Sequence, residues 1–277
     1  MRASMIAALT VLGLLTVACV PAPPPEPVGQ QVTVMSFNIH HGVGADGVLE
    51  LQRIADTVAR SGAGIVGLQE VDRHFHERSD FVDQATWLAQ TLGMHVAFGA
   101  NLDLDPIDPA DPRRQYGNAV LSAYPILSST NTLLPLEAEG EQRGLLEAVV
   151  EVDGTELRTY STHLQHDSQS ARIAQIAAIR SYLANSSSDS SVVLLGDLNA
   201  TPDSPEIAAI VEDLTDSWEE AGVGDGFTYS TDSPSVRIDY VLTSGDLTTR
   251  TAAVIASDAS DHLPVSATLT IPVPVMA

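Results

Sequence analysis

The chain has 277 residues, 44% of them hydrophobic, which is enough to bury the core of one large domain or two small ones. Its charge is lopsided: 13 Lys+Arg, all of them arginine, stand against 36 Asp+Glu and give a formal net charge of -23. Nucleic-acid affinity rests on cations that neutralise phosphates, so this composition makes long duplex DNA a poor default substrate. A small phosphate ester is not excluded as a substrate, because one local cluster of arginines is enough to bind its phosphate.

The first 18 residues are predicted to be a signal peptide. Met1 and Arg2 form a short basic start, and Met5 to Ala18 form an apolar stretch of 14 residues, which is short for a membrane-spanning helix. The single cysteine, Cys19, follows directly, and the stretch LTVAC resembles a bacterial lipoprotein signal. That resemblance implies lipid attachment at Cys19; plain secretion and a retained anchor are the alternatives.

Residues 19–31 form a Pro-rich stretch that is typical of an extended tether. We therefore expect an exported protein. It would be lipid-anchored at the outer face of the cell membrane, or otherwise secreted.

Residues 32–277 alternate short apolar runs with amphipathic stretches, without an internal repeat of solenoid length. We expect strands at 32–37, 64–70, 118–124, 145–152, 157–162, 191–196, 237–243, 251–257 and 264–271. We expect helices at 48–60, 83–92, 168–183 and 205–214. Several strands are apolar on both faces, which indicates a one-domain α/β sandwich whose sheets are covered on each side. The Pro/Asp-rich stretch 100–115 is expected to be a surface loop.

Six apolar segments carry a polar residue at or near a terminus. In chain order these residues are Asn38, Glu70, His163, the pair Asp197 and Asn199, Asp239, and the pair Asp261 and His262. A buried polar group without a partner costs about 1–3 kcal/mol, so six unrelated cases would be expensive. We therefore expect these side chains to share one site at an edge of the sheets.

Each residue taken alone also has a purely structural explanation. Asp197 could form an Asx turn before a helix, Glu70 could pair with Arg73, and His163 could be a satisfied core histidine. Four other histidines lie in polar contexts and are expected at the surface: His40, His41, His74 and His76. The six segments together nevertheless favour a common site.

The residue types narrow the chemistry. The chain has no cysteine outside the leader, no Gly-rich phosphate loop and no G-x-S-x-G motif. Carboxylates and amides combined with neutral histidines favour Mg²⁺ or Mn²⁺ over zinc. Asp239 could hold His262 in one tautomer, and Asp197 beside Asn199 suits an attacking water. This combination favours a metal-assisted phosphoester hydrolase.

Seven motifs occur in a fixed order over about residues 32–271: SFNIHHG, GLQEVD, YGNAVLSAYPI, STHLQHD, GDLNATP, RIDYVL and SDHLPV. In order and spacing they resemble the endonuclease/exonuclease/phosphatase superfamily, which has a deoxyribonuclease I-like fold. The resemblance implies a four-layer α/β sandwich, in which two packed mixed β-sheets are flanked by helices and the site lies at one end of the sheets.

The resemblance also implies roles for these residues. Glu70 would be the principal metal ligand, with Asn38 beside it and Asp261 supporting a metal or His163. Three further residues are carried over as phosphate-facing groups: Arg143, Tyr116 and Asn118.

The remaining residues would be catalytic. Asp197 would align or deprotonate the water, Asn199 would hold the phosphate, and His163 would hydrogen-bond the phosphoryl oxygens in the transition state. Asp239 would orient His262, which would act as general acid/base or as charge stabiliser.

The chain departs from some relatives in ways that bear on substrate. Relatives that cut DNA surround this site with basic loops, whereas this chain has no lysine and an acidic insertion. Sphingomyelinase-like relatives grip membranes with exposed aromatic hairpins, and with 5% aromatic residues this chain has no such hairpin.

The favoured interpretation is an exported Mg²⁺- or Mn²⁺-dependent phosphoesterase, which hydrolyses a phosphodiester or phosphomonoester of a small or lipid-linked substrate. A secreted nuclease is one alternative; it predicts an arginine cluster near the site, and Arg113–Arg114 is the only adjacent pair. A non-catalytic binding module is another, but it predicts lost metal or histidine positions and none is lost. We expect a monomer that meets the membrane only through its lipid anchor.

Overall fold

The computed structural model describes residues 29–185 and 190–272. Its strands, in chain order, are β1 (Gly29–Asn38), β2 (Ile65–Arg73), β3 (His95–Leu104), β4 (Arg114–Ser122), β5 (Ile126–Leu133), β6 (Gly144–Val152), β7 (Thr155–His163), β8 (Ser191–Asp197), β9 (Thr215–Asp216), β10 (Asp239–Thr243), β11 (Thr248–Val254) and β12 (Val265–Pro272). Its helices are α1 (Leu51–Ser61), α2 (Gln84–Leu92), α3 (Gln169–Asn185), α4 (Pro205–Ile210) and α5 (Ser217–Ala221), with short 3₁₀ turns η1 (His40–Gly42) and η2 (Glu77–Ser79).

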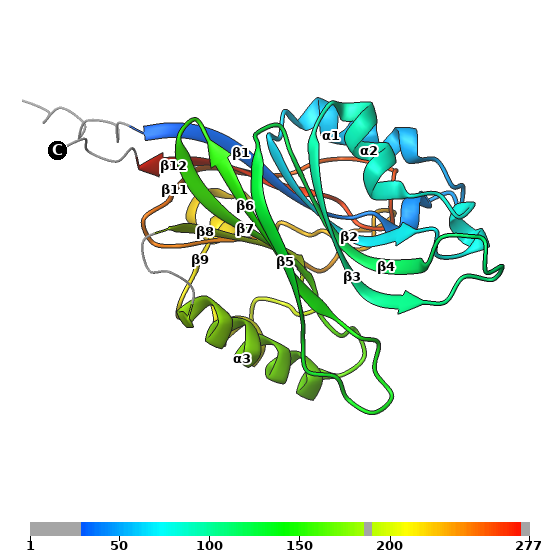
Figure 1. The fold of residues 1–277 in the computed structure, drawn as a ribbon. Coiled ribbons are helices and arrows are strands. Elements are labelled where there is room, and N and C mark those ends of the chain that lie inside the picture. Colours follow the sequence, from blue (N-terminus) through cyan, green and yellow to red (C-terminus); the bar gives the residue numbers. More distant parts are fainter. Residues whose placement is uncertain (1–28, 186–189, 273–277) are drawn as a thin grey trace, which may run out of the picture.

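Two six-stranded mixed sheets pack face to face and form the centre of the molecule (Figure 1). The first has the strand order β11-β12-β1-β2-β4-β3, and the second has the order β5-β6-β7-β8-β10-β9. Helices α1 and α2 cover the outer face of the first sheet, and α3 and α4 cover the outer face of the second. This arrangement confirms the predicted four-layer sandwich.

The two-residue period of the strands decides which side chains reach the space between the sheets. On β1, Val32 and Val34 enter the core between the sheets, whereas Met35 and Phe37 pack beneath α1 and α2. The same alternation on β8 puts Val193 and Leu195 in the core between the sheets. Continued to the strand ends, the alternation turns the last residue of each strand toward that same space, namely Asn38 on β1 and Asp197 on β8.

Strand directions bring these last residues to one end of the sandwich. Strands β1 and β2 run parallel, as do β7 and β8. Strand β10 runs antiparallel to β8, so it begins where β8 ends, and Asp239 lies directly opposite Asp197. Five strands of two sheets therefore deliver polar residues to the same place.

Several expected boundaries are corrected by the backbone pairing. Strand β1 begins at Gly29 instead of residue 32, because residues 29–31 pair with the end of β12. The stretch 100–115 is not a loop throughout: β3 runs to Leu104 and β4 begins at Arg114, and these two residues pair with each other. Only residues 105–113 connect the two strands.

The expected signal peptide, residues 1–18, lies outside the described residues, as do Cys19 and most of the tether. Among the residues that are described, no helix is both long enough and apolar enough to cross a membrane.

Candidate active site

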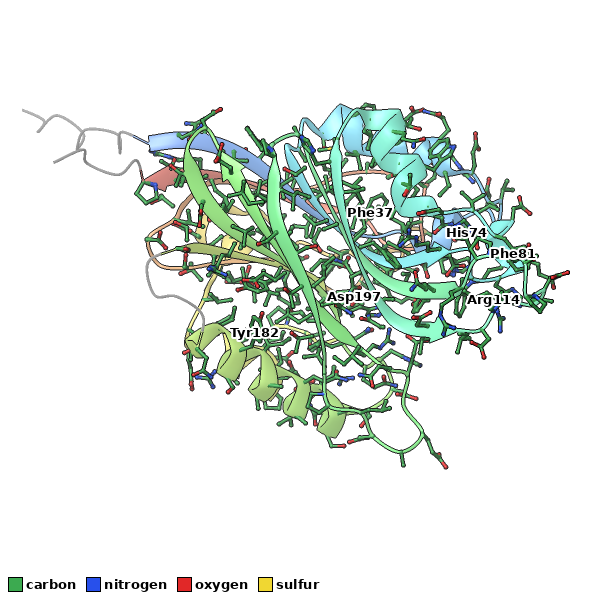
Figure 2. The ribbon with its side chains drawn as sticks, viewed as in Figure 1. Phe37, His74, Phe81, Arg114, Tyr182 and Asp197 are labelled. Atoms are coloured by element: carbon green, nitrogen blue, oxygen red, sulfur yellow. The ribbon has the colours of Figure 1, made fainter. Side chains whose placement is uncertain are left out.

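A cavity of about 530 Å³ opens at the end of the sandwich where the six polar segments meet. Asp197 lies there, between the two sheets (Figure 2). The lining residues are His40, His41, Glu70, Arg78, Tyr116, Glu141, Arg143, His163, His166, Asp197, Asn199, Tyr229, Ile238, Asp261 and His262. Two predicted residues outside this lining contact it directly, because Asn38 bonds to Glu70 and Asp197, and Asp239 bonds to His262.

Asp197 is 1% exposed and uses its two carboxylate oxygens differently. Oδ1 accepts the backbone N–H of Asn199 at 2.9 Å, which closes an Asx turn after β8. Oδ2 accepts Asn38 Nδ2 at 2.9 Å and lies 3.4 Å from His163 Nε2 and 3.6 Å from His262 Nε2. Burial, reinforced by the nearby Asp239 and opposed by His262, raises the pKa of Asp197 from its ordinary value of 3.8 to about 7.

His262 forms a buried pair with Asp239. Its Nδ1 lies 2.9 Å from Asp239 Oδ2, and the Tyr229 ring packs against the imidazole with centroids 4.8 Å apart. Burial works against a charged imidazole, but Asp239 and Asp197 outweigh it and raise the pKa of His262 to about 10. At neutral pH the ring is therefore an imidazolium, with Nδ1 donating to Asp239 and Nε2 directed toward Asp197.

His163 is neutral and its tautomer follows from its neighbours. Burial, together with the positive charge of Arg143, lowers the pKa of His163 well below its ordinary value. Arg143 Nη1 lies 3.1 Å from His163 Nδ1, and because a guanidinium only donates, Nδ1 accepts. The ring proton is therefore on Nε2, where Asp197 Oδ2 at 3.4 Å can accept it; the Asn199 amide, 2.9 Å away, can accept that proton only through its oxygen.

Glu70 reaches the cavity because β2 is bulged. The pairing with β4 shifts between Leu68 and Val71, so two residues of β2 oppose one of β4, and Glu70 has a left-handed φ of 59°. Burial alone would raise the pKa of Glu70, but His41, His163 and the hydrogen bond from Asn38 outweigh it and lower that pKa. The carboxylate is thus held ionised at the cavity wall.

The residues around Glu70 fit a divalent cation. Its Oε2 lies 3.9 Å from Nδ1 of His41, a buried nitrogen without a hydrogen-bond partner among the described residues. Asp261 Oδ1 lies 3.8 Å from His40 Nδ1 on the same side of the cavity. An ionised carboxylate, a second carboxylate and the unpartnered Nδ1 of His41 form a donor set that Mn²⁺ accepts, and the carboxylate oxygens of this set also suit Mg²⁺.

Asn38, predicted as a metal ligand, contacts two carboxylates through its amide nitrogen, and its role toward a cation stays a prediction. Its Oδ1 accepts the backbone N–H of His40 at 3.1 Å, and its Nδ2 faces Glu70 and Asp197. An amide that presents N–H groups to two carboxylates holds them in position and cannot coordinate metal through that face.

A second group of potential ligands lies deeper in the site. Ligand atoms of Asp197, Asp239 and His262 lie within 4.8 Å of one another, and all three side chains are buried. Asp239 Oδ1 has no hydrogen-bond partner among the described residues. Here the imidazolium of His262 lies between the two carboxylates and offsets one of their two negative charges.

The three residues carried over as phosphate-facing groups have different placements. Arg143 is 4% exposed and lies in the cavity wall, where Nη1 also bonds Glu141 at 2.7 Å. Tyr116 also lines the wall, beneath Arg78. Asn118 is not brought to the cavity: it is buried between the sheets, and its Nδ2 donates to the carbonyl oxygen of Gly144 at 3.1 Å. Its predicted contact with phosphate therefore disagrees with its position.

Several lining residues were not anticipated. His40 and His41 were expected at the surface, yet they line the cavity because η1 turns back directly after Asn38; their position right after that residue was a usable signal. Arg78 comes from η2 and is anchored by a two-pronged ion pair to the buried Asp72, at 2.9 and 2.8 Å. The hydrophobic periodicity of the sequence cannot predict that Arg78, a residue of a short turn, lines the cavity.

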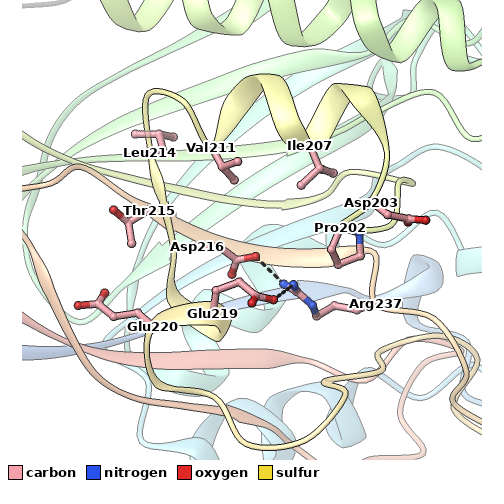
Figure 3. A pocket seen from close by; sticks show the side chains of 10 residues that line it. All are labelled: Pro202, Asp203, Ile207, Val211, Leu214, Thr215, Asp216, Glu219, Glu220 and Arg237. Atoms are coloured by element: carbon pink, nitrogen blue, oxygen red, sulfur yellow. Dashed lines mark hydrogen bonds and ion pairs between the residues drawn. The ribbon is translucent and has the colours of Figure 1, made fainter.

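A larger hollow, of about 810 Å³, lies beside α4 and α5 (Figure 3). Apolar Ile207, Val211 and Leu214 line one side of it. Its buried Arg237 is occupied by Asp216 and Glu219, each at 2.6 Å. It contains no histidine among its lining residues, so volume alone does not locate the chemistry of this molecule.

Comparisons with known proteins agree with this geometry. The sequence model of the Endonuclease/Exonuclease/phosphatase family matches residues 35–262. A solved endonuclease/exonuclease/phosphatase from Beutenbergia cavernae is 27% identical, covers 89% of this chain and 73% of its own, and superposes with a TM-score of 0.76. A mannosyl-6-phosphatase from Bacteroides thetaiotaomicron shares the fold at 19% identity and a TM-score of 0.69, covering 87% of this chain and 100% of its own.

Among curated proteins, Protein cwh43 of Schizosaccharomyces pombe is 29% identical over 153 residues, which is 55% of this chain. The match spans only 15% of the length of that relative.

Proposed function

The chain belongs to the endonuclease/exonuclease/phosphatase family, and from this premise we propose that it is a divalent-metal-dependent hydrolase of a phosphodiester or phosphomonoester. The substrate would be a small or lipid-linked molecule. The observation that carries the proposal is the meeting of an ionised carboxylate, Glu70, with the buried Asp197, His163 and His262 around one cavity.

Each group has a chemical role that follows from its environment. A cation bound at Glu70 and Asp261 would supply positive charge beside the phosphoryl oxygens. Asp197, with its pKa raised to about 7, can accept a proton from water near neutral pH, which an ordinary aspartate does poorly. The Asx turn holds this carboxylate in one orientation, so a water that it binds is also aligned.

The two histidines act as hydrogen-bond donors. His262, whose pKa is raised to about 10, keeps its charge at neutral pH and stabilises negative charge through Nε2. This favours the charge-stabilising role over proton release. His163 is neutral and donates from Nε2, because Arg143 occupies Nδ1. Both donors are fixed before substrate arrives, so little reorganisation is needed in the transition state.

A nucleic-acid substrate is less well supported. Arg113, part of the only adjacent arginine pair, is already bound to Asp103 at 2.6 Å and to Asp105 at 2.7 Å. The two arginines of the cavity, Arg78 and Arg143, are likewise paired with carboxylates. These contacts leave little uncompensated positive charge along which a polyanion could lie.

The decisive experiment is a substrate panel measured with Mg²⁺, with Mn²⁺ and with EDTA after metal stripping. It contains an aryl phosphodiester, an aryl phosphomonoester, a phosphoinositide, sphingomyelin and plasmid DNA. We expect hydrolysis of at least one small or lipid ester only when a divalent cation is present. Glu70→Gln should abolish that activity, and Glu139→Gln, an exposed carboxylate outside the cavity, should not. Turnover that is undiminished in EDTA after metal stripping would contradict the proposal.

We also propose that the protein is exported and anchored through lipid at Cys19, as the leader and tether suggest. A single acyl chain holds a protein to a bilayer only marginally, so stable anchoring needs the several chains of a lipoprotein. Cys19→Ala should release the protein from the membrane fraction and leave its activity in detergent unchanged. A wild-type protein that already fractionates as soluble would make Cys19 incidental.

A further inference from the structure

A second cavity, of about 540 Å³, lies at the outer ends of β2 and β4. We call it the outer pocket; it is lined by His74, Phe81, Ile107, Asp111, Pro112 and Arg114. Figure 2 labels three of these residues, His74, Phe81 and Arg114, together at one end of the molecule. None of the six residues that line the outer pocket has a role in the proposed hydrolysis.

The strand register makes the outer pocket a continuation of the catalytic cavity. Asp72 of β2 lies directly opposite Tyr116 of β4, so their side chains share one face of the sheet. Arg114 precedes Tyr116 by two residues on β4, so the alternation of that strand extends the same face outward. His74 lies just beyond the end of β2, where a left-handed φ of 52° ends the alternation, and it lines the outer pocket from there. The row that lines the catalytic cavity at Tyr116 therefore reaches the outer pocket at Arg114.

Arg78 lines the catalytic cavity and belongs to the turn whose two ends line the outer pocket. It is bound to Asp72, and its guanidinium lies 5.5 Å from the centre of the Tyr116 ring and 5.2 Å from that of Phe75. The turn that carries Arg78 also carries His74 and Phe81, one on each side. Residues 74–81 thus connect the two cavities along the chain, because Arg78 lines the catalytic cavity and His74 and Phe81 line the outer pocket.

Arg114 is chemically available within this pocket. Arg113 beside it is bound to two aspartates, whereas Arg114 has no ion pair with any carboxylate in the described ranges 29–185 and 190–272. Its Nε donates to the carbonyl oxygen of Asp105 at 2.9 Å, which fixes the group and leaves its terminal nitrogens for a ligand. His74 is similarly fixed, because Nδ1 donates to the Phe81 carbonyl at 2.8 Å and Nε2 stays available.

The walls of the outer pocket expose large apolar side chains. Phe81 is 39% exposed and Ile107 is 70% exposed, and Leu104, at 40%, lies opposite Arg114 on β3. Apolar side chains gathered beside a polar cavity typically mark a binding surface. The catalytic cavity, by contrast, is lined almost entirely by charged and polar groups.

We propose that the outer pocket binds an apolar alkyl or aryl substituent of the phosphate ester, with Arg114 donating to an oxygen near its point of attachment. This assignment rests on the proposed function, since it places the phosphate in the catalytic cavity. The polar cavity holds the phosphoryl group, and the neighbouring apolar walls hold the group that the phosphate carries. Specificity for an amphiphilic ester would then reside in Phe81 and Ile107.

The test measures binding by calorimetry, with Mg²⁺, of three phosphonates that cannot be hydrolysed: methyl, phenyl and octyl. We expect the octyl or the phenyl compound to bind at least about tenfold more tightly than the methyl compound, the effect of burying about two methylene groups. Preference for octyl identifies an alkyl chain, and preference for phenyl identifies an aryl group. Ile107→Ser should remove most of this gain and leave the methyl compound unchanged.

The matched control is Val223→Ser, a 90% exposed aliphatic residue outside both cavities, which should keep the full gain. Phe81→Asn provides a second variant on the opposite wall, and it suits a residue with a φ of 52°. Equal affinities for the three compounds, or a gain that survives in Ile107→Ser, would overturn the assignment. Phosphonate binding without any ester hydrolysis would instead overturn the proposed function and leave the pocket standing.

Discussion

At the scale of single residues, Asp197 combines two interpretations that looked exclusive in the sequence. One was an Asx turn and the other was a catalytic carboxylate. The structure contains the turn, made by Oδ1 and the Asn199 N–H, and it also turns Oδ2 into the cavity between two histidines. A residue that shapes its own loop while facing the substrate is held rigidly, which suits a group that must align a water.

Asp197→Asn should therefore separate the two roles. The amide can still accept the Asn199 N–H, but it has no charge with which to deprotonate water, so kcat should fall by about 10³-fold or more. Stability should change by less than about 1 kcal/mol, because the loss of a buried charge offsets an amide that now faces Asn38 Nδ2. Steady-state kinetics and a melting curve measure both, with Asp56→Asn on α1 as the control. Early melting with normal activity would restrict Asp197 to the turn.

The pair formed by Asp239 and His262 makes stability depend on pH. The pKa of His262 rises from 6.5 to about 10 on folding, so its stabilisation is complete below pH 6.5 and is lost as pH rises through 10. The raised pKa of Asp197, about 7, also lowers the stability of the fold as pH rises, here between pH 4 and 7. The lowered pKa of Glu70 has the opposite effect: the ionised carboxylate stabilises the fold at neutral pH, and this stabilisation is lost as pH falls below about 4.

In EDTA, the melting temperature should therefore fall by about 5 °C or more between pH 6 and pH 9.5. His262→Gln should flatten this fall, whereas His95→Gln, at an exposed position, should not. A profile that is the same in all three proteins would mean that His262 does not carry the charge assigned to it.

At the scale of elements, the bulge in β2 marks the limit of what the sequence could predict. Ile65 points between the sheets and Val66 points outward, so strict alternation would send Glu70 to the outer face, beneath the helices. The extra residue between Leu68 and Val71 reverses that direction. The apolar run before Glu70 indicated an important carboxylate, but no local pattern reveals a bulge.

Glu70→Gly tests whether this strand accepts strain for the sake of the site. A left-handed φ costs a residue with a side chain about 1 kcal/mol, and glycine removes that cost. Because any substitution also removes the stabilising carboxylate, the comparison is with Glu70→Ala: metal-free Glu70→Gly should melt at a higher temperature than Glu70→Ala, and both should bind Mg²⁺ at least about tenfold more weakly by calorimetry. Asp153→Gly, at a φ of 44° in a hairpin turn, should likewise melt above Asp153→Ala, with normal Mg²⁺ binding in both. Equal melting temperatures for Glu70→Gly and Glu70→Ala would show that the bulge stores no strain.

The elements that were missed share a physical cause. Strand β5 is an edge strand whose residues are mostly exposed and polar, so it carries no alternation toward a core. Strand β3 was missed because its second half overlaps the Pro/Asp-rich stretch, although backbone pairing with β4 continues to Leu104. The strands that end in polar residues were predicted because both of their faces are buried, and the six-segment pattern therefore located the site while the turns η1 and η2 were left out.

At the scale of the whole molecule, the net charge of -23 governs how large anions approach. A polyanion is repelled, and salt screens that repulsion, with a screening length of about 10 Å at 0.1 M. Any residual cleavage of plasmid DNA should therefore accelerate between 20 and 200 mM NaCl, whereas hydrolysis of a small monoanionic ester should change less than about twofold. A nuclease that binds through cations would show the opposite salt dependence, so DNA cleavage that slows with salt would favour the nuclease alternative.

The pairing of Gly29 with Pro272 has a consequence for how the molecule can be handled. These two residues lie at one end of the paired strands β1 and β12 (Figure 1), whereas at the other end Asn38 contacts Glu70 and Asp197, and His262, shortly before Val265, lines the cavity. A strand of ten residues is about 33 Å long, so a bead or solid support attached beyond either end stands roughly that far from the cavity mouth. Immobilisation through the chain ends should therefore leave every copy oriented with its cavity open to the solution, and a flow reactor built in this way should retain the specific activity of the free protein.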